Sequence, residues 1–224
     1  MPKVKLPRKS TVIDMTAMCD VAFLLLSFFI LTTKFKPAEA LAVVTPTSVH
    51  SKIAPGKDFV MITIDKDGKV YFSVSDENPN EKQEILEAIS TSKNLGLTAA
   101  EINAFKQPAA YIGVPFSQLK SYLAKTPDEL KGVKVSGIPV LDSTDNQLVE
   151  WMRAAATAFQ GSKMNILVKG DNDSKYPSFQ AVINAFKKND QMKFQMITSP
   201  VGVPPGTELY KKNMAATPGA ESTP

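Results

Sequence analysis

One carboxylic acid, Asp20, lies inside an otherwise apolar stretch near the start of the chain, MTAMCDVAFLLLSFFILTT at residues 15–33. As a helix this stretch would be about 28 Å long, which matches a bilayer core of about 30 Å. A charged Asp near the middle of a spanning helix costs roughly 2.5 to 3.5 kcal/mol. A residue with that cost needs a function, and proton exchange is the chemistry that an acid inside the membrane could supply.

Two other polar residues, Thr16 and Ser27, lie within about 40° of Asp20 on a helical projection. This polar stripe indicates that one side of the helix meets protein or water instead of lipid. Three roles for Asp20 remain open at this point. If Asp20 is buried between helices, burial would favour its neutral form and let it exchange protons. If it lies at the membrane–water interface, its side chain would only extend to the lipid headgroups. If it lies between two paired helices, it would only fix how the helices pair.

A second acidic group is KGDNDSK, residues 169–175, which contains Asp171 and Asp173. The two could form a carboxylate pair at the carboxyl end of a parallel strand, a common place for active sites. Alternatively, Gly170 and Asp171 turn the chain, and Asp173 or Ser174 caps a helix that begins near Pro177. No nucleophile with a base and no phosphate loop accompanies the group, so we favour the turn and predict that the protein is not an enzyme.

The composition excludes several other classes of site. Cys19 is the only cysteine and His50 the only histidine, so an intramolecular disulfide is impossible and we expect no zinc site, other metal or cofactor. The net charge of +4 equals the four cations that precede the first acidic residue, which argues against a distributed nucleic-acid surface. These cations are Lys3, Lys5, Arg8 and Lys9.

The N-terminal apolar segment could be a cleaved signal peptide or a retained anchor. A basic start, a short apolar run and the small residues AEA at 38–40 fit a signal peptide. Lys34 and Lys36 in the cleavage region, and Asp20 at the front of the apolar run, favour an anchor. The excess of cations before the helix places its N-terminus in the cytoplasm.

Two blocks of the sequence resemble the ExbD/TolR family. IDMTAMCDVAFLLLSFFILTT, residues 13–33, is similar to the family's N-terminal signature, with Asp20 on its one intramembrane Asp and with Thr16 and Thr33 on its usual Thr positions. Residues 164–198 resemble the family's closing strand, Asp turn, helix and strand. A weaker match is the hairpin DFVMITIDKDGKVYF at 58–72. Ala17 and Cys19 depart from the customary Pro and apolar residue, but neither departure removes a titrating group.

The resemblance implies a single-pass protein of the bacterial inner membrane with its C-terminal domain in the periplasm. It implies a homodimer inside a ring of a polytopic partner resembling ExbB or TolQ, with contacts to the membrane and to the cell-wall peptidoglycan. The pair would form a proton channel that drives TonB-dependent transport across the outer membrane through a protein resembling TonB or TolA. Asp20 would then carry the proton, with Thr16, Ser27 and Thr33 as polar neighbours.

Other roles stay open beside this one. Within the family, a TolR-like role in envelope maintenance or a motility motor fits the same residues. Outside it, the chain could be a secreted binding module or a membrane-anchored structural module without proton coupling.

We expect an α+β fold with five regions along the chain. These are a basic cytoplasmic N-terminus at 1–14, a single transmembrane helix at 15–33, a Pro-rich linker at 34–57, a small periplasmic domain at 58–200 and a disordered tail at 201–224. The domain would hold a mixed sheet, built from a hairpin and a right-handed βαβ unit. Residues 75–136 read as a helical insertion relative to a minimal family member.

Local signals locate the elements of the domain. Alternating apolar residues on both sides of the turn DKDG predict strands at 59–64 and 70–74. Thr98 with Glu101 forms a capping box, Thr126 precedes Pro127 as an N-cap, and Asp145 or Asn146 caps a longer helix. Strands at 164–168 and 193–198 flank a helix at 179–188 and should pair in parallel. We expect the exposed strand edges to be docking sites for an extended peptide.

Overall fold

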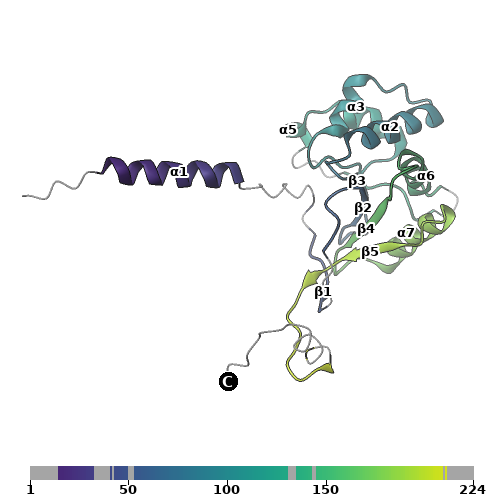
Figure 1. Cartoon of the computed structure of the whole chain (residues 1–224). Coiled ribbons are helices and arrows are strands. Elements are labelled where there is room, and N and C mark those ends of the chain that lie inside the picture. Colours follow the sequence, from purple (N-terminus) through teal and green to yellow (C-terminus); the bar gives the residue numbers. More distant parts are fainter. Residues whose placement is uncertain are drawn as a thin grey trace, which may run out of the picture. The chain divides into compact units, whose positions relative to one another are not determined.

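The computed structural model describes residues 15–32, 41, 43–49, 53–130, 135–142, 145–208 and 210. The chain divides into two compact units, Met1–Pro37 and Ala38–Pro224. The first unit contains one described helix, α1, and the second contains the sheet and the remaining helices (Figure 1). Two residues singled out above, Thr33 and His50, lie outside the described residues, as do the chain ends at 1–14 and 211–224.

The first unit contains the predicted N-terminal helix, α1, which runs from Thr16 to Thr32 and is 17 residues long. Its ends lie one residue inside the predicted 15–33. In the part of the chain that the structure describes, no helix has both the length and the apolar character needed to cross a membrane.

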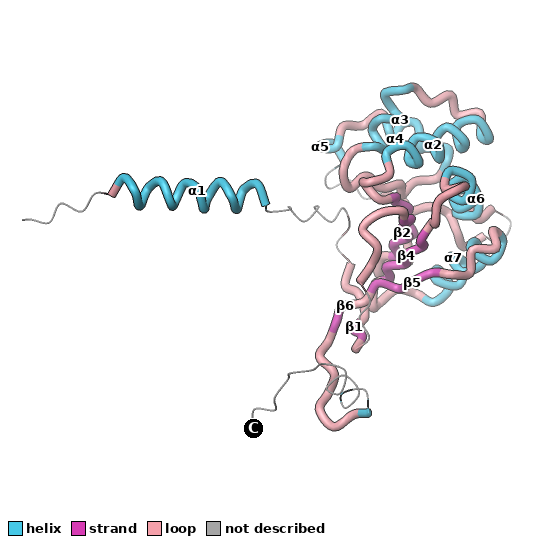
Figure 2. Tube along the Cα trace, viewed as in Figure 1, coloured by secondary structure: helices cyan, strands magenta, loops and turns pink. Residues whose placement is uncertain are grey.

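A four-stranded mixed sheet forms the centre of the second unit, in the order β3-β2-β4-β5. Figure 2 shows β2, β4 and β5 of this sheet in magenta. The hairpin pairs β2 and β3 antiparallel, while β2 with β4 and β4 with β5 are parallel. The predicted α+β class, the hairpin and the parallel closing strands are confirmed. The strands are β2 (Phe59–Ile64), β3 (Val70–Val74), β4 (Asn165–Gly170) and β5 (Phe194–Ile197).

Helices pack on one face of this sheet and enclose one core. Alternate residues of β2 and β4, such as Ile62 and Val168, point to this face and are fully buried. Phe186 of α7 and Trp151 of α6 cover them, and the Trp151 ring lies 5.2 Å from that of Phe72 between centroids. The helices outside the insertion are α6 (Leu148–Ala158) and α7 (Tyr176–Lys188), which connects β4 to β5.

The predicted insertion at 75–136 is helical, as expected. Its helices are α2 (Pro79–Lys93), α3 (Ala99–Lys106), α4 (Phe116–Leu123) and α5 (Pro127–Leu130). Thr98 and Glu101 form the predicted capping box at the start of α3. Thr126 precedes α5, and its side chain accepts a bond from the Glu129 N–H at 3.4 Å. Local helix-start signals therefore located both helices correctly.

The insertion and the residues directly after it also cover one edge of the sheet, which the sequence did not predict. Ile112 exchanges two backbone hydrogen bonds with Phe72 of β3, at 2.7 and 2.8 Å, and the Ile138 N–H donates to the Val70 carbonyl at 2.8 Å. Between these bridges the chain passes close to β3 at Gly113, where a Cβ would overlap the Tyr71 ring. The β3 edge is therefore bonded within the chain.

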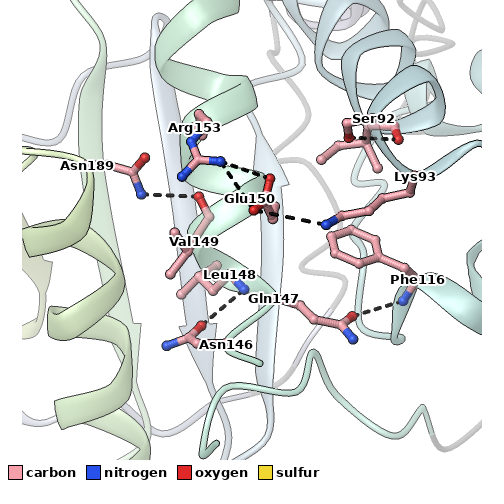
Figure 3. Close-up of polar contacts among 11 residues, drawn as sticks. Ser92, Lys93, Phe116, Asn146, Gln147, Leu148, Val149, Glu150, Arg153 and Asn189 are labelled. Atoms are coloured by element: carbon pink, nitrogen blue, oxygen red, sulfur yellow. Dashed lines mark hydrogen bonds and ion pairs between the residues drawn. The ribbon is translucent and has the colours of Figure 1, made fainter. Parts of the chain in front are cut away.

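Three polar bonds fix α6 against its neighbours (Figure 3). The Asn146 side chain accepts a bond from the first N–H of α6 at 3.1 Å. The predicted cap at Asp145 or Asn146 is nevertheless one or two residues too early, because the N-cap of α6 is Gln147, whose side chain makes no capping bond. Gln147 accepts from the Phe116 N–H at 3.0 Å, and Asn189 donates to the Val149 carbonyl at 3.1 Å. These bonds join α6 to α4 in the insertion and to the end of α7.

A buried ion pair holds α2 against the loop that follows α3. Lys82 is 0% exposed, and its Nζ lies 2.5 Å from Oδ1 of Asp76. The other oxygen of Asp76 accepts the Ala109 N–H at 3.0 Å, and Lys82 also donates to the Gln107 carbonyl at 3.5 Å. The pair thus connects α2 with residues 107–109.

We expect Asp76→Ala to destabilise the domain by about 2 kcal/mol, because it leaves the buried Lys82 ammonium without its counter-charge. The value is below the usual cost for a fully buried pair, since the Asp76 side chain is 38% exposed. Chemical denaturation of the full chain in detergent measures the change. Lys82→Met combined with Asp76→Ala should recover most of the loss, and equal stability of Asp76→Ala and wild type would refute the role of the pair.

Candidate functional site

The surface of α1 is apolar on nearly every side. None of its residues is buried, and large side chains such as Phe23 and Leu31 are 68% and 86% exposed. Within the first unit, no described residue outside α1 and Met15 is present to cover them. A helix that is apolar around its whole circumference needs an apolar environment from elsewhere.

Asp20 lies in the second turn of α1, and its side chain is exposed. The helix places it one turn after Thr16 and seven residues before Ser27, so the three predicted polar residues share one stripe. Along residues 15–32, no hydrogen bond or ion pair involves the Asp20 carboxylate. Its acceptor oxygens therefore have no partner among the described residues.

Two hydroxyl groups of α1 are bonded inside the helix. Ser27 donates to the Leu24 carbonyl at 2.9 Å, and Thr32 donates to the Phe28 carbonyl at 2.7 Å. Such bonds lower the need of a hydroxyl for an external partner. Sequence analysis did not single out Thr32. A Thr in a helix commonly donates to the carbonyl four residues earlier, as Thr32 does to Phe28. Of the two side chains, Asp20 can carry a charge and Ser27 cannot.

The acidic turn after β4 does not form a carboxylate pair. Oδ1 of Asp171 accepts the Asp173 N–H at 3.0 Å, and its Oδ2 accepts the Val44 N–H at 3.1 Å. Asp171 turns the chain, as predicted. The predicted helix cap at Asp173 or Ser174 is wrong, because the N-cap of α7 is Lys175 and no side chain bonds there.

Pro177 gives a physical reason for the missing cap. It lies in the first turn of α7 and has no N–H, so the helix start has one fewer donor for a capping side chain to satisfy. Among the described residues, no group of three or more His, Cys, Asp and Glu is placed to hold a metal ion.

Asp171 also attaches the segment that leads from α1 into the domain. We call residues 43–48 the docked segment. Val44 donates to Asp171, and its carbonyl accepts the Asn172 N–H at 2.8 Å. Farther along, β1 (Thr47–Ser48) pairs in parallel with β6 (Ser199–Pro200), directly after β5. The Val201 N–H also donates to the Ser48 carbonyl at 3.0 Å. Part of the region expected to be linker is therefore bonded to the end of the expected domain and to the first residue of the expected tail.

Hydrogen bonds, more than apolar burial, hold the docked segment in place. The Ser199 N–H donates to the Pro46 carbonyl at 2.9 Å, and the Thr45 and Ser199 hydroxyls lie 2.7 Å apart. Val44 is 73% exposed, so its side chain contributes little burial. Segments of this kind open at lower free energy than the core. Two-residue strands are too short to give an alternation signal, which explains why the sequence did not predict them.

Comparison with known proteins gives one match. The family model described as biopolymer transport protein ExbD/TolR matches residues 7–201. No curated protein and no solved structure matches the chain. The matched region includes Asp20, the hairpin, the insertion and the closing strands.

We expect Asp171→Ala to release the docked segment, because it removes the acceptor of the Val44 N–H. The loss of one such bond costs about 1 kcal/mol, so the open fraction should rise about fivefold. Hydrogen–deuterium exchange of the full chain should then be faster at residues 43–48 and unchanged in β2 and β4. Asp173→Ala is the matched control, since only its backbone N–H bonds to Asp171. Equal exchange in the two variants would contradict the assignment.

Proposed function

The chain belongs to the ExbD/TolR family of biopolymer transport proteins, and from that premise we propose that it is an energy-transducing subunit of an inner-membrane motor. The motor is of the ExbB–ExbD type and uses the proton motive force to power TonB-dependent transport across the outer membrane. One observation carries the proposal: Asp20 is an acid without a bonding partner in the described chain, on a helix whose other surface is almost wholly apolar.

In this proposal α1 lies in the bacterial inner membrane. Its 17 residues rise about 26 Å, a few ångströms less than the hydrocarbon core of about 30 Å. The exposed apolar side chains of α1 support this placement, because lipid would cover them. The four cations before the helix outnumber Lys34 and Lys36 after it, which supports a cytoplasmic N-terminus and a periplasmic second unit.

Asp20 is the proposed proton carrier. Protonation removes its charge and lets the side chain pass an apolar part of a surrounding protein ring, and deprotonation returns it to a polar position. A proton that crosses the membrane releases about 2.3 kcal/mol per 100 mV, so repeated cycles bias the relative motion of the helices. Thr16, Ser27 and Thr33 are proposed polar neighbours of this path.

The proposed assembly contains two copies of this chain, a polytopic ring protein like ExbB or TolQ, and a transducer like TonB or TolA. Contact of the second unit with peptidoglycan belongs to the same proposal. A TolR-like role in envelope maintenance, or a role in a motility motor, would use Asp20 in the same way. An anchored structural module would not need Asp20 to ionise.

The β5 edge is the proposed site of strand pairing with a second copy or with an extended peptide. The opposite edge, β3, is already bonded to Ile112 and Ile138. Among the described strands β5 pairs only with β4, and Met196 on it is 48% exposed. An edge strand with one unpaired side and exposed apolar residues favours pairing with another chain.

We expect Asp20→Asn to abolish uptake of a scarce outer-membrane receptor substrate while the complex still assembles. Asn keeps the shape of the side chain but cannot ionise, so it separates proton coupling from helix pairing. Uptake and detergent tolerance should be followed in the native cells at matched protein level.

Ser27→Ala is the matched control, since the Ser27 hydroxyl is bonded within α1, and it should leave uptake near wild type. If Asp20→Asn loses detergent tolerance but keeps uptake, the chain has the TolR-like role in envelope maintenance. If Asp20→Asn keeps wild-type uptake and wild-type detergent tolerance, the proton-coupling proposal is wrong.

We expect Met196→Lys to weaken self-association of the full chain about tenfold, because a charge on the unpaired edge of β5 opposes strand pairing. Sedimentation velocity in detergent measures the monomer–dimer equilibrium. Leu141→Lys is the control, because Leu141 is an apolar residue that is 69% exposed and lies outside the sheet. If both variants shift the equilibrium equally, the dimer does not use β5.

A further inference from the structure

The insertion forms a small open pocket against the start of β3. The pocket lies between Lys69, helix α4 and residues 135–136, and its volume is about 220 Å³. This volume is below the range of about 300–1,000 Å³ that drug-sized ligands occupy, and it would hold about seven water molecules. A ligand of this pocket must therefore be a small molecule.

Two lysines give the pocket its charge. Lys69 and Lys125 line it from opposite elements, the hairpin and the end of α4, and none of the described lining residues is acidic. The Lys69 ammonium donates to the Val135 carbonyl at 3.1 Å, which fixes it at the wall. Within the described part of the chain, no ion pair joins either lysine to a carboxylate.

Two acidic residues close in sequence to the pocket lysines are bonded to other groups. Asp65 accepts the backbone N–H of Lys69 at 2.8 Å and the Tyr71 hydroxyl at 2.9 Å. Glu129 accepts the Thr126 N–H at 2.8 Å, and hydrogen bonds from Thr126, with a smaller contribution from the Lys125 charge, lower the pKa of its carboxyl. Each of these carboxylates therefore has neutral donors of its own, and neither lines the pocket.

The remaining walls are neutral. Val135 supplies apolar surface, and the buried Tyr122 supplies an aromatic side chain. The Tyr122 hydroxyl donates to the Tyr111 carbonyl at 2.8 Å, and burial raises its pKa, so it adds no negative charge at neutral pH. Gln118 and Ser136 contribute exposed polar groups that can donate hydrogen bonds.

We propose that this pocket binds a small organic or inorganic dianion, such as a dicarboxylate or a phosphate. Two ammonium groups without an acidic neighbour in the lining match two negative charges. A zwitterion would bring an ammonium group for which the lining has no carboxylate. Except for Lys69, all lining residues belong to the insertion at 75–136, so the inference assigns the insertion a ligand-binding role and is independent of proton coupling at Asp20.

Isothermal titration of the full chain in detergent at low salt tests this inference. The probes are succinate, inorganic phosphate and succinamide, which is the neutral analogue of succinate. We expect succinate or phosphate to bind with a dissociation constant of about 0.1 to 1 mM, and succinamide to bind at least about tenfold more weakly.

The variants use a control on the same helix. Lys125→Gln and Lys69→Gln should each weaken binding about tenfold, with unfolding curves recorded to confirm the fold. Lys120→Gln removes the same charge from α4, but the Lys120 ammonium donates to the Gly96 carbonyl at 2.9 Å and does not line the pocket. It should leave binding unchanged. Because Lys125 is exposed, its variant decides the test if Lys69→Gln unfolds.

Binding of succinate alone identifies a dicarboxylate site, and binding of phosphate alone identifies a phosphate site. The proposal is overturned if neither binds, if succinamide binds as well as succinate, or if Lys120→Gln weakens binding as much as Lys125→Gln. None of these outcomes changes the proposed role of Asp20, because the titration does not measure uptake.

Discussion

The parallel pairing of β2 with β4 is the constraint on which the rest of the domain depends. Six residue pairs, from Phe59 with Asn165 to Ile64 with Gly170, join the hairpin to the closing βαβ unit. The roughly ninety residues between β3 and β4 must therefore leave the sheet and return to its centre. The cost of closing a long loop grows only slowly with length. An insertion of several helices is thus compatible with the same sheet, provided that it buries its own apolar side chains.

The insertion meets that condition and changes the surface of the sheet at the same time. Its helices share one core with the sheet, through residues such as Leu86 and Phe105. Ile112 in the insertion and Ile138 just after it bond to β3, which removes the backbone groups that an edge strand would offer to another chain. Among the described strands, the opposite edge at β5 is therefore the one left for pairing.

Local signals in the sequence predicted the helices and strands of the domain. They could not predict contacts between residues that lie far apart in the chain. The hairpin and the Thr98–Glu101 capping box depend on residues a few positions apart, so periodicity and cap chemistry were sufficient. The bond from Val44 to Asp171 joins residues 127 positions apart and leaves no pattern in either segment. The failed cap at Asp173 or Ser174 has a local cause instead, because Pro177 removes one donor from the first turn of α7. Asp20 was identified from its apolar surroundings, and the structure adds that no described residue bonds to it.

The docked segment lies between α1 and β2 along the chain, so in the proposed motor any pull from α1 passes through it before it reaches the sheet. Its backbone attachments, such as those of Val44 and Pro46, contribute about 0.5 to 1.5 kcal/mol each. The energy of one proton across 100 mV, about 2.3 kcal/mol, is equivalent to roughly two such bonds. The β2–β4 pairing is stronger, because it is buried with Ile62 and Val168 in the core. A force generated by single protons would therefore release the docked segment from Asp171 well before it disturbed the sheet.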